Sequence, residues 1–172
     1  MDYWNDPLPT DVVAQTLADL MSDVMKTSLI QHEEAPEITS AGGSRPPGGH
    51  TIKKHAGKTD AELKERFTSE IKCRVNSGFY HDISFAETLI AKALLSHLDE
   101  VYNWYAGTSS PGANKDLDIE YTNNFPVGRK FRKKFPHAAP QEVSNIIVVL
   151  RKVPSGDSHN GRRNFILTAY PN

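Results

Sequence analysis

Two histidines and several cations lie close together in the run from Gly48 to Thr59, and Arg66 follows shortly after it. A histidine with an unperturbed pKa of roughly 6.5 can take or give a proton at neutral pH. Beside a fixed cation it suits phosphoryl chemistry, because the imidazole removes a proton while the guanidinium stabilises charge on the phosphorus oxygens. His50, His55 and Arg66 are therefore candidates for catalysis. Solvated His and Lys side chains that lead into a helix would explain the same run.

Other catalytic patterns are missing from the sequence. It has no P-loop, no Gly-x-Gly-x-x-Gly, no Gly-x-Ser-x-Gly and no His-Glu-x-x-His. The carboxylates form no tight cluster that would hold Mg²⁺, so a metal-dependent nuclease is disfavoured, although scattered ligands can converge in space. Cys73 is the single cysteine, which excludes an intramolecular disulfide and a Cys-rich zinc site. We expect Cys73 to be a small, half-buried filler.

Charge is distributed unevenly along the chain. Residues 1–49 hold two basic and eight acidic residues, a net charge of −6, whereas residues 50–172 hold 18 basic and 13 acidic ones, a net charge of +5. An acidic leader and a basic body fit a body that meets a polyanion. No apolar run is long enough to span a bilayer, and the N-terminus lacks the features of a signal peptide. Export would need another route or a larger parent chain.

The sequence divides into a leader and a domain. Apolar residues at helical spacing predict an amphipathic helix over residues 10–31. The Gly-, Pro- and Ser-rich stretch over residues 41–49 predicts a linker. We therefore assign residues 1–47 to a leader or delivery segment and residues 48–172 to the domain proper, and expect a chain that begins near Gly48 to keep its activity.

Within the domain, helices come first and strands later. Thr59 and Glu62 have the spacing of a capping box, which predicts a helix over residues 60–71 with Leu63, Phe67 and Ile71 on one face. Ser84 and Glu87 repeat the signal and predict one longer helix as far as Tyr105. β-prone runs predict strands over residues 119–121, 129–135, 145–150 and 165–170, the last two forming an antiparallel pair. This order favours an α+β fold, with the N-terminal helices packed on a C-terminal antiparallel sheet.

The segments GGHTIKKHAGKTDAELKERF and NFILTAYPN resemble the bacterial ribonuclease A-like toxin domain. That domain lies at the C-terminus of contact-dependent growth inhibition proteins and related polymorphic toxins. The resemblance covers roughly residues 48–172 and implies a ribonuclease A-like fold without disulfides. Ala56 stands where the family pattern favours a bulkier aliphatic residue.

By position, the resemblance implies four catalytic residues, His55, Arg66, Thr168 and Tyr170. Thr168 and Tyr170 are two apart on a predicted strand and so project from the same face. Substrate-binding candidates are His50, Lys58, Arg129 and Lys130.

Several alternatives stay open for these residues. His50 could be the acid–base group in place of His55, Lys58 could be only a solvated cation, and Tyr170 could be a sheet aromatic. The basic run over residues 129–134 could follow an RNA backbone or protect an edge strand. We expect the remaining histidines considered, His81, His97, His137 and His159, to face solvent.

The resemblance implies an endoribonuclease, with tRNA as the expected substrate, that uses the RNA 2′-hydroxyl as nucleophile and needs no metal or organic cofactor. It also implies a toxin that is delivered from its producer and acts in the cytoplasm of a competitor cell. A cognate immunity protein, which we expect to be acidic, would neutralise it, and the toxin would be monomeric or in a 1:1 complex with this inhibitor. The rival interpretations are a catalytically silent RNA-binding module and a DNA-directed or metal-dependent nuclease.

Overall fold

The computed structural model describes residues 28–33, 48–106, 116–153, 159–161 and 164–172. The helix predicted over residues 10–31 and the linker predicted over residues 41–49 lie mostly outside this range. The helices are α2 (Leu29–Glu33), α3 (Thr51–Lys54), α4 (Asp60–Ser69), α5 (Ile83–Ser96) and α6 (Leu98–Ala106). The strands are β1 (Val75–Phe79), β2 (Asp116–Thr122), β3 (Gly128–Arg132), β4 (Gln141–Val143), β5 (Asn145–Lys152) and β6 (Asn164–Pro171). No helix in the described part of the chain is long and apolar enough to cross a membrane.

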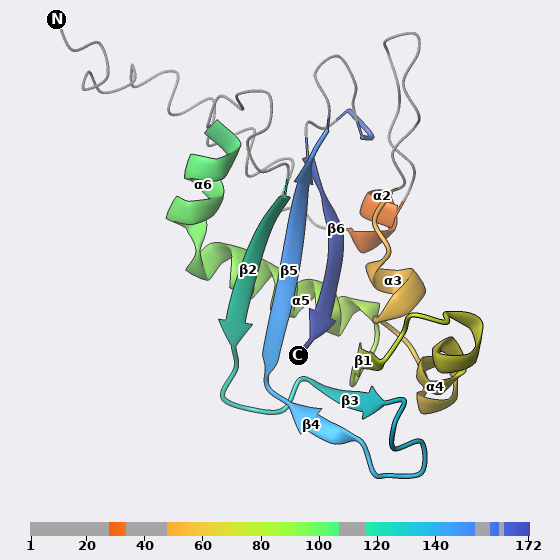
Figure 1. Cartoon of the computed structure of the whole chain (residues 1–172). Helices are drawn as coiled ribbons and strands as arrows, with labels where there is room; N and C mark the ends of the chain where they lie inside the picture. Colours follow the sequence, from red (N-terminus) through yellow and green to blue (C-terminus); the bar gives the residue numbers. More distant parts are fainter. Residues whose placement is uncertain (1–27, 34–47, 107–115, 154–158, 162–163) are drawn as a thin grey trace, which may run out of the picture.

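The larger sheet has the strand order β2-β5-β6 and is antiparallel throughout. The apolar run in β5 makes it the central strand, as the sequence predicts, and β5 and β6 form the expected antiparallel pair. Figure 1 shows α5 crossing one face of this sheet. Leu89, Ile90 and Leu94 of α5 pack there in the main hydrophobic core. The fold is thus α+β with its helices largely ahead of the strands, as expected.

The smaller sheet has the order β1-β3-β4, also antiparallel. Helix α4 packs beside it, where Leu63, Phe67 and Phe131 form a second buried cluster with Cys73 against it (Figure 1). The half-buried position expected for Cys73 is confirmed. Because β3 lies between β1 and β4, and Lys133 and Lys134 follow its end, the edge-strand explanation of the basic run is wrong.

Two helix predictions need correction. Helix α4 has the predicted capping box between Thr59 and Glu62, but it ends at Ser69, and Ile71 is 82% exposed instead of buried. The single helix predicted as far as Tyr105 is two helices, α5 and α6. The N-cap of α5 is Asp82, whose side chain accepts from the Phe85 N–H. The capping box expected at Ser84 therefore does not form. Glu87 instead accepts from the N–H of Leu29 at 2.8 Å.

The free edge of β6 is covered by α2, α3 and the residues just before α3, and this arrangement sets the position of the site. A register shift between Val149 and Leu150 leaves Leu167 as the extra residue of a bulge, and its carbonyl accepts from the His50 N–H at 2.9 Å. Thr51 Oγ1 accepts from the Ala169 N–H at 2.8 Å. At Gly49 the two backbones approach so closely that a Cβ would clash with the Ile166 carbonyl oxygen. The GGHT segment therefore fixes α3 against β6.

The prediction that His159 faces solvent is wrong. Its ring is fully buried, stacks on Phe165 at 4.4 Å and contacts the Gln31 carbonyl through Nε2 at 2.8 Å. His81 and His137 are exposed as expected, and His97 is half-buried, with Nδ1 at 3.0 Å from the Ala93 carbonyl oxygen.

Candidate active site

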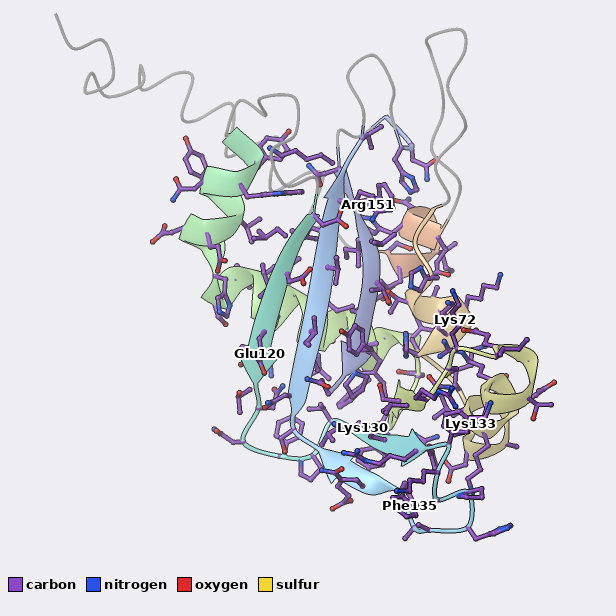
Figure 2. All side chains as sticks on the ribbon, in the orientation of Figure 1. Lys72, Glu120, Lys130, Lys133, Phe135 and Arg151 are labelled. Atoms are coloured by element: carbon purple, nitrogen blue, oxygen red, sulfur yellow. The ribbon has the colours of Figure 1, made fainter. Side chains whose placement is uncertain are left out.

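A cavity of about 310 Å³ opens where α3, α4, β1 and the carboxyl end of β6 meet. All four residues predicted to be catalytic line it, together with two of the predicted substrate-binding residues: His55, Arg66, Thr168, Tyr170, His50 and Lys130. Figure 2 shows Lys130 on β3, near the end of β6. Among the described residues, no Asp or Glu side chain lines the cavity. The cavity is therefore a cationic pocket suited to an anion such as phosphate.

The His55 imidazole is buried and held in one orientation. Its Nδ1 lies 2.7 Å from the Ser77 carbonyl oxygen, and because a carbonyl can only accept, Nδ1 must carry the proton. Nε2 is then the atom with a free lone pair. Burial lowers the pKa of His55 to about 3, and the cation of Arg66 adds to this shift. His55 is thus a neutral base at neutral pH in the unliganded protein.

Arg66 reaches the cavity from α4 and is fixed by three residues. Its Nε and one Nη donate to the Glu70 carboxylate at 2.9 and 3.1 Å, while the other Nη donates to Asn76 Oδ1 and, at 3.4 Å, to the Lys54 carbonyl. Asn76 is itself buried and donates to the Leu63 carbonyl at 2.7 Å. The guanidinium is therefore preorganised at the wall of the pocket, and within the described residues these bonds leave one of its N–H groups for a ligand.

Thr168 and Tyr170 lie side by side on β6 and both face the cavity, as their spacing predicts. The Thr168 hydroxyl is buried and has no hydrogen-bond partner among the described residues. Buried hydroxyls are almost always paired, so this one points to a ligand or a water. The Tyr170 ring packs 5.4 Å from the His55 ring, and burial raises the pKa of its phenol, with Asp118 adding to the shift.

His50 also lines the cavity, so the structure places both candidate histidines there. Burial lowers the pKa of His50, and the nearby cations of Lys54 and Arg66 lower it further. His50 differs from His55 in being only half-buried, and no hydrogen bond of its ring is recorded among the described residues. The firmer anchoring of His55 supports it as the acid–base group, and that role stays a prediction.

Two predicted substrate-binding residues do not line this cavity. Lys58 lies just before α4, and its ammonium pairs with Glu62 at 3.6 Å. The Arg129 guanidinium is bonded to Asp60 and donates to the carbonyls of Phe79 and Lys58 at 2.9 and 2.8 Å. Arg129 therefore ties the start of α4 to β1, outside the cavity.

Three further residues contribute to the site, and none of them was among the residues predicted from the sequence. Asn76 and the carbonyl of Ser77 hold Arg66 and His55, and Lys54 lines the pocket. The KKH run could have indicated Lys54. The roles of β1 follow from a long-range pairing with β3 that no local pattern shows. Within the described residues, no group of three His, Cys, Asp or Glu side chains gathers as a metal site would require.

The fold and the site together define a small α+β protein with a histidine–arginine pocket of the kind that serves phosphoryl transfer. The chain belongs to the family of bacterial CdiA-CT RNase A domains, whose family model matches residues 49–171. It is also similar to a chain in the crystal structure of a CdiA-CT/CdiI complex from Y. kristensenii, with 28% sequence identity and a TM-score of 0.57. That similarity covers 72% of this chain and 99% of the other. A search of curated protein sequences gave no significant match.

Proposed function

We propose that this protein is a metal-independent toxin endoribonuclease that cleaves RNA by transphosphorylation through the substrate's own 2′-hydroxyl. The observation that carries the proposal is the composition of one cavity. It joins a neutral, anchored imidazole, a preorganised guanidinium and an unpartnered buried hydroxyl, with no acidic side chain among its described lining residues. Family membership supports the same activity.

In this reaction, Nε2 of His55 accepts the proton of the 2′-hydroxyl while the 2′-oxygen attacks phosphorus. The bond from phosphorus to the 5′-oxygen breaks, which leaves a 2′,3′-cyclic phosphate and a 5′-hydroxyl. The hydrogen bond from Nδ1 to Ser77 keeps the imidazole in the tautomer that this step needs. The low pKa of His55 keeps the base unprotonated before the substrate binds.

Arg66 and Lys54 stabilise the negative charge that develops on the phosphoryl oxygens. The fixed position of Arg66 matters here, because a preorganised donor costs no rearrangement at the moment of reaction. Thr168 Oγ1 donates to a phosphate oxygen or to a base edge, which would satisfy the hydroxyl left without a partner.

Tyr170 supplies the proton for the leaving 5′-oxygen or orients the phosphate. Its phenol is protonated at neutral pH even at the ordinary pKa of about 10, and burial raises that pKa further. Its ring lies against His55, so both groups can reach the same phosphate.

The expected substrate is tRNA in the cytoplasm of a competitor cell that receives the toxin from its producer. The solved relative is a CdiA-CT/CdiI complex. By analogy, a cognate immunity protein would bind this chain in its producer. We expect that protein to be acidic, since it has to replace RNA at a pocket lined by Lys54, Arg66 and Lys130.

The test is to incubate the full chain with total tRNA in excess EDTA and to analyse the products on a gel. Cleavage should persist, and His55→Ala and Arg66→Ala should each lower the rate by about a hundredfold or more. His81→Ala, an exposed histidine outside the cavity, is the matched control and should cleave normally. RNA binding without cleavage would indicate a silent module, and loss of activity in EDTA a metal-dependent nuclease. Tolerance of His55→Ala with loss in His50→Ala would reassign the base.

A further inference from the structure

A second cavity, of about 250 Å³, adjoins the active site across Lys130, which lines both. Its other walls come from the basic run and from the chain that leads into β4: Phe131, Arg132, Phe135, Ala138–Ala139 and Gln141. In Figure 2, Lys130 is labelled on β3 and Phe135 near the chain that leads into β4. A polymer whose phosphate lay in the first cavity would pass the second one.

The walls of this second cavity are largely apolar and include two phenylalanines, Phe131 and Phe135. Phe131 is buried in the cluster under α4, where its ring also carries the ammonium of Lys64 at 5.0 Å. Phe135, by contrast, is 55% exposed. Its ring is therefore accessible to a ligand that enters the second cavity.

The rim of the second cavity is polar and cationic. Lys130 and Arg132 contribute positive charge, Gln141 contributes an amide that can both donate and accept, and no Asp or Glu is among the described lining residues. Lys134 Nζ lies 5.6 Å from the Phe135 ring centroid. Cations beside an aromatic ring are the usual platform for a single-stranded nucleic acid, in which a base stacks and the phosphates pair with cations.

We infer that this cavity binds one unpaired nucleobase next to the scissile phosphate, by stacking on Phe135. The inference rests on the proposed function and deepens it, since it makes the substrate a single-stranded or loop segment of RNA. The volume of this cavity is smaller than the roughly 300–1,000 Å³ of pockets that bind drug-sized ligands, and such a volume suits a single planar base. Gln141 would contact the edge of that base, and Lys130 would bridge the two subsites.

The test measures binding and cleavage separately. Binding of the four 2′-O-methyl RNA homohexamers, which cannot be cleaved through the 2′-oxygen, is measured for the full chain by fluorescence anisotropy. Phe135→Ala should raise the Kd about tenfold, on the scale of one base–aromatic stack, and Phe135→Trp should restore it. Phe125→Ala removes another exposed phenylalanine, which lines neither cavity, and should bind normally.

Abasic hexamers locate the contact. One abasic position should weaken binding to the wild type about tenfold, and Phe135→Ala should show no further loss on that probe. Equal affinity of Phe135→Ala and wild type for the intact hexamer would overturn the subsite, even if the wild type cleaves tRNA. Phe135-dependent binding without tRNA cleavage by the wild type would uphold the subsite and refute the proposed function.

Discussion

At the scale of single residues, the site depends on β1 as much as on the groups that would touch the substrate. Asn76 and the carbonyl of Ser77 are adjacent on one strand, and they hold Arg66 and His55 respectively. Neither belongs to a motif with known chemistry, yet together they set the orientation of both catalytic candidates. Asn76 is therefore a positioning residue.

Replacing Asn76 with Ala should lower kcat by about tenfold to a hundredfold, since a small misplacement of a catalytic group has effects of this size. The variant also removes the Asn76 hydrogen bonds to the Leu63 carbonyl and to the Arg66 guanidinium, so it should lose roughly 1–3 kcal/mol of stability. Steady-state kinetics on folded protein and thermal unfolding test both effects. Full activity in the folded variant would show that Arg66 needs no support from Asn76.

The pKa of His55 makes a prediction about pH. Since burial lowers it to about 3, the base form persists as the pH falls through 6.5, and the acid limb of kcat/KM should lie well below 6.5. The same shift affects stability, because unfolded His55 takes up a proton near pH 6.5 while folded His55 does not. Stability should therefore fall as the pH drops from 6.5 towards 3.

His55→Asn isolates this contribution from that of other buried histidines. The urea midpoint of unfolding is measured at neutral pH and at pH 4.5 for both proteins. The decrease in the midpoint from neutral pH to pH 4.5 should be larger for the wild type than for the variant. An acid limb near pH 6.5, together with equal pH sensitivity of the two proteins, would contradict the buried, neutral state of His55.

At the scale of elements, the sequence predicts what local patterns control. The capping box at Thr59 and the apolar β5 form as expected, because each depends on neighbouring residues. By contrast, β1 reads Val-Asn-Ser-Gly-Phe, with no alternation to indicate a strand, and it forms through its pairing with β3. The buried position of His159 depends on distant partners such as Gln31, which no spacing rule indicates.

The candidate catalytic residues follow the same division. The family resemblance places His55, Arg66, Thr168 and Tyr170, and all four do meet in one cavity. Arg129 is a residue type that often binds phosphate, but here its guanidinium donates to Asp60 and to two backbone carbonyls. These partners are far from Arg129 in the sequence, so no local pattern indicates them. The tertiary structure therefore decides which cationic side chains remain available to bind a ligand.

Helix α2 belongs to the sequence assigned to the leader, yet it packs on the domain. Leu29 is fully buried, Glu33 accepts from the Ile52 N–H at 2.7 Å, and the His32 ring accepts from the Ile166 N–H at 3.0 Å. A domain boundary at residue 48 therefore separates residues that contact one another.

A chain that begins at Gly48 should be less stable than one that begins at Ser28. Loss of a buried leucine alone typically costs about 2–5 kcal/mol, and the cap on α3 is lost as well. The folded fraction should still cleave RNA, because the cavity-lining residues lie at or beyond His50. Unfolding curves and activity at low temperature compare the two chains. Equal stability would show that α2 adds nothing, and an inactive but folded short chain would place α2 within the active unit.

At the scale of the whole molecule, the net charge is −6 over residues 1–49 and +5 over residues 50–172, and this contrast bears on the inhibitor. A toxin that acts on RNA requires a partner that protects its producer. An acidic protein that covers the pocket should associate quickly through electrostatic steering, with a rate constant that falls as salt rises. Stopped-flow binding at several salt concentrations, with the product of the neighbouring gene, tests this. A salt-independent rate, with the surface around His55 left open in crosslinking, would indicate an inhibitor bound elsewhere.

In the proposed mechanism the attacking group belongs to the RNA, and the protein supplies the base, the acid, the cations and the hydrogen bonds around them. The most direct measurement takes an RNA cut at one mapped bond and replaces the nucleotide on the 5′ side of that bond with its 2′-deoxy analogue. Without the 2′-hydroxyl, cleavage at that bond should disappear, while the unmodified RNA yields a 2′,3′-cyclic phosphate and a 5′-hydroxyl. Cutting of the deoxy substrate at the same bond would contradict the mechanism.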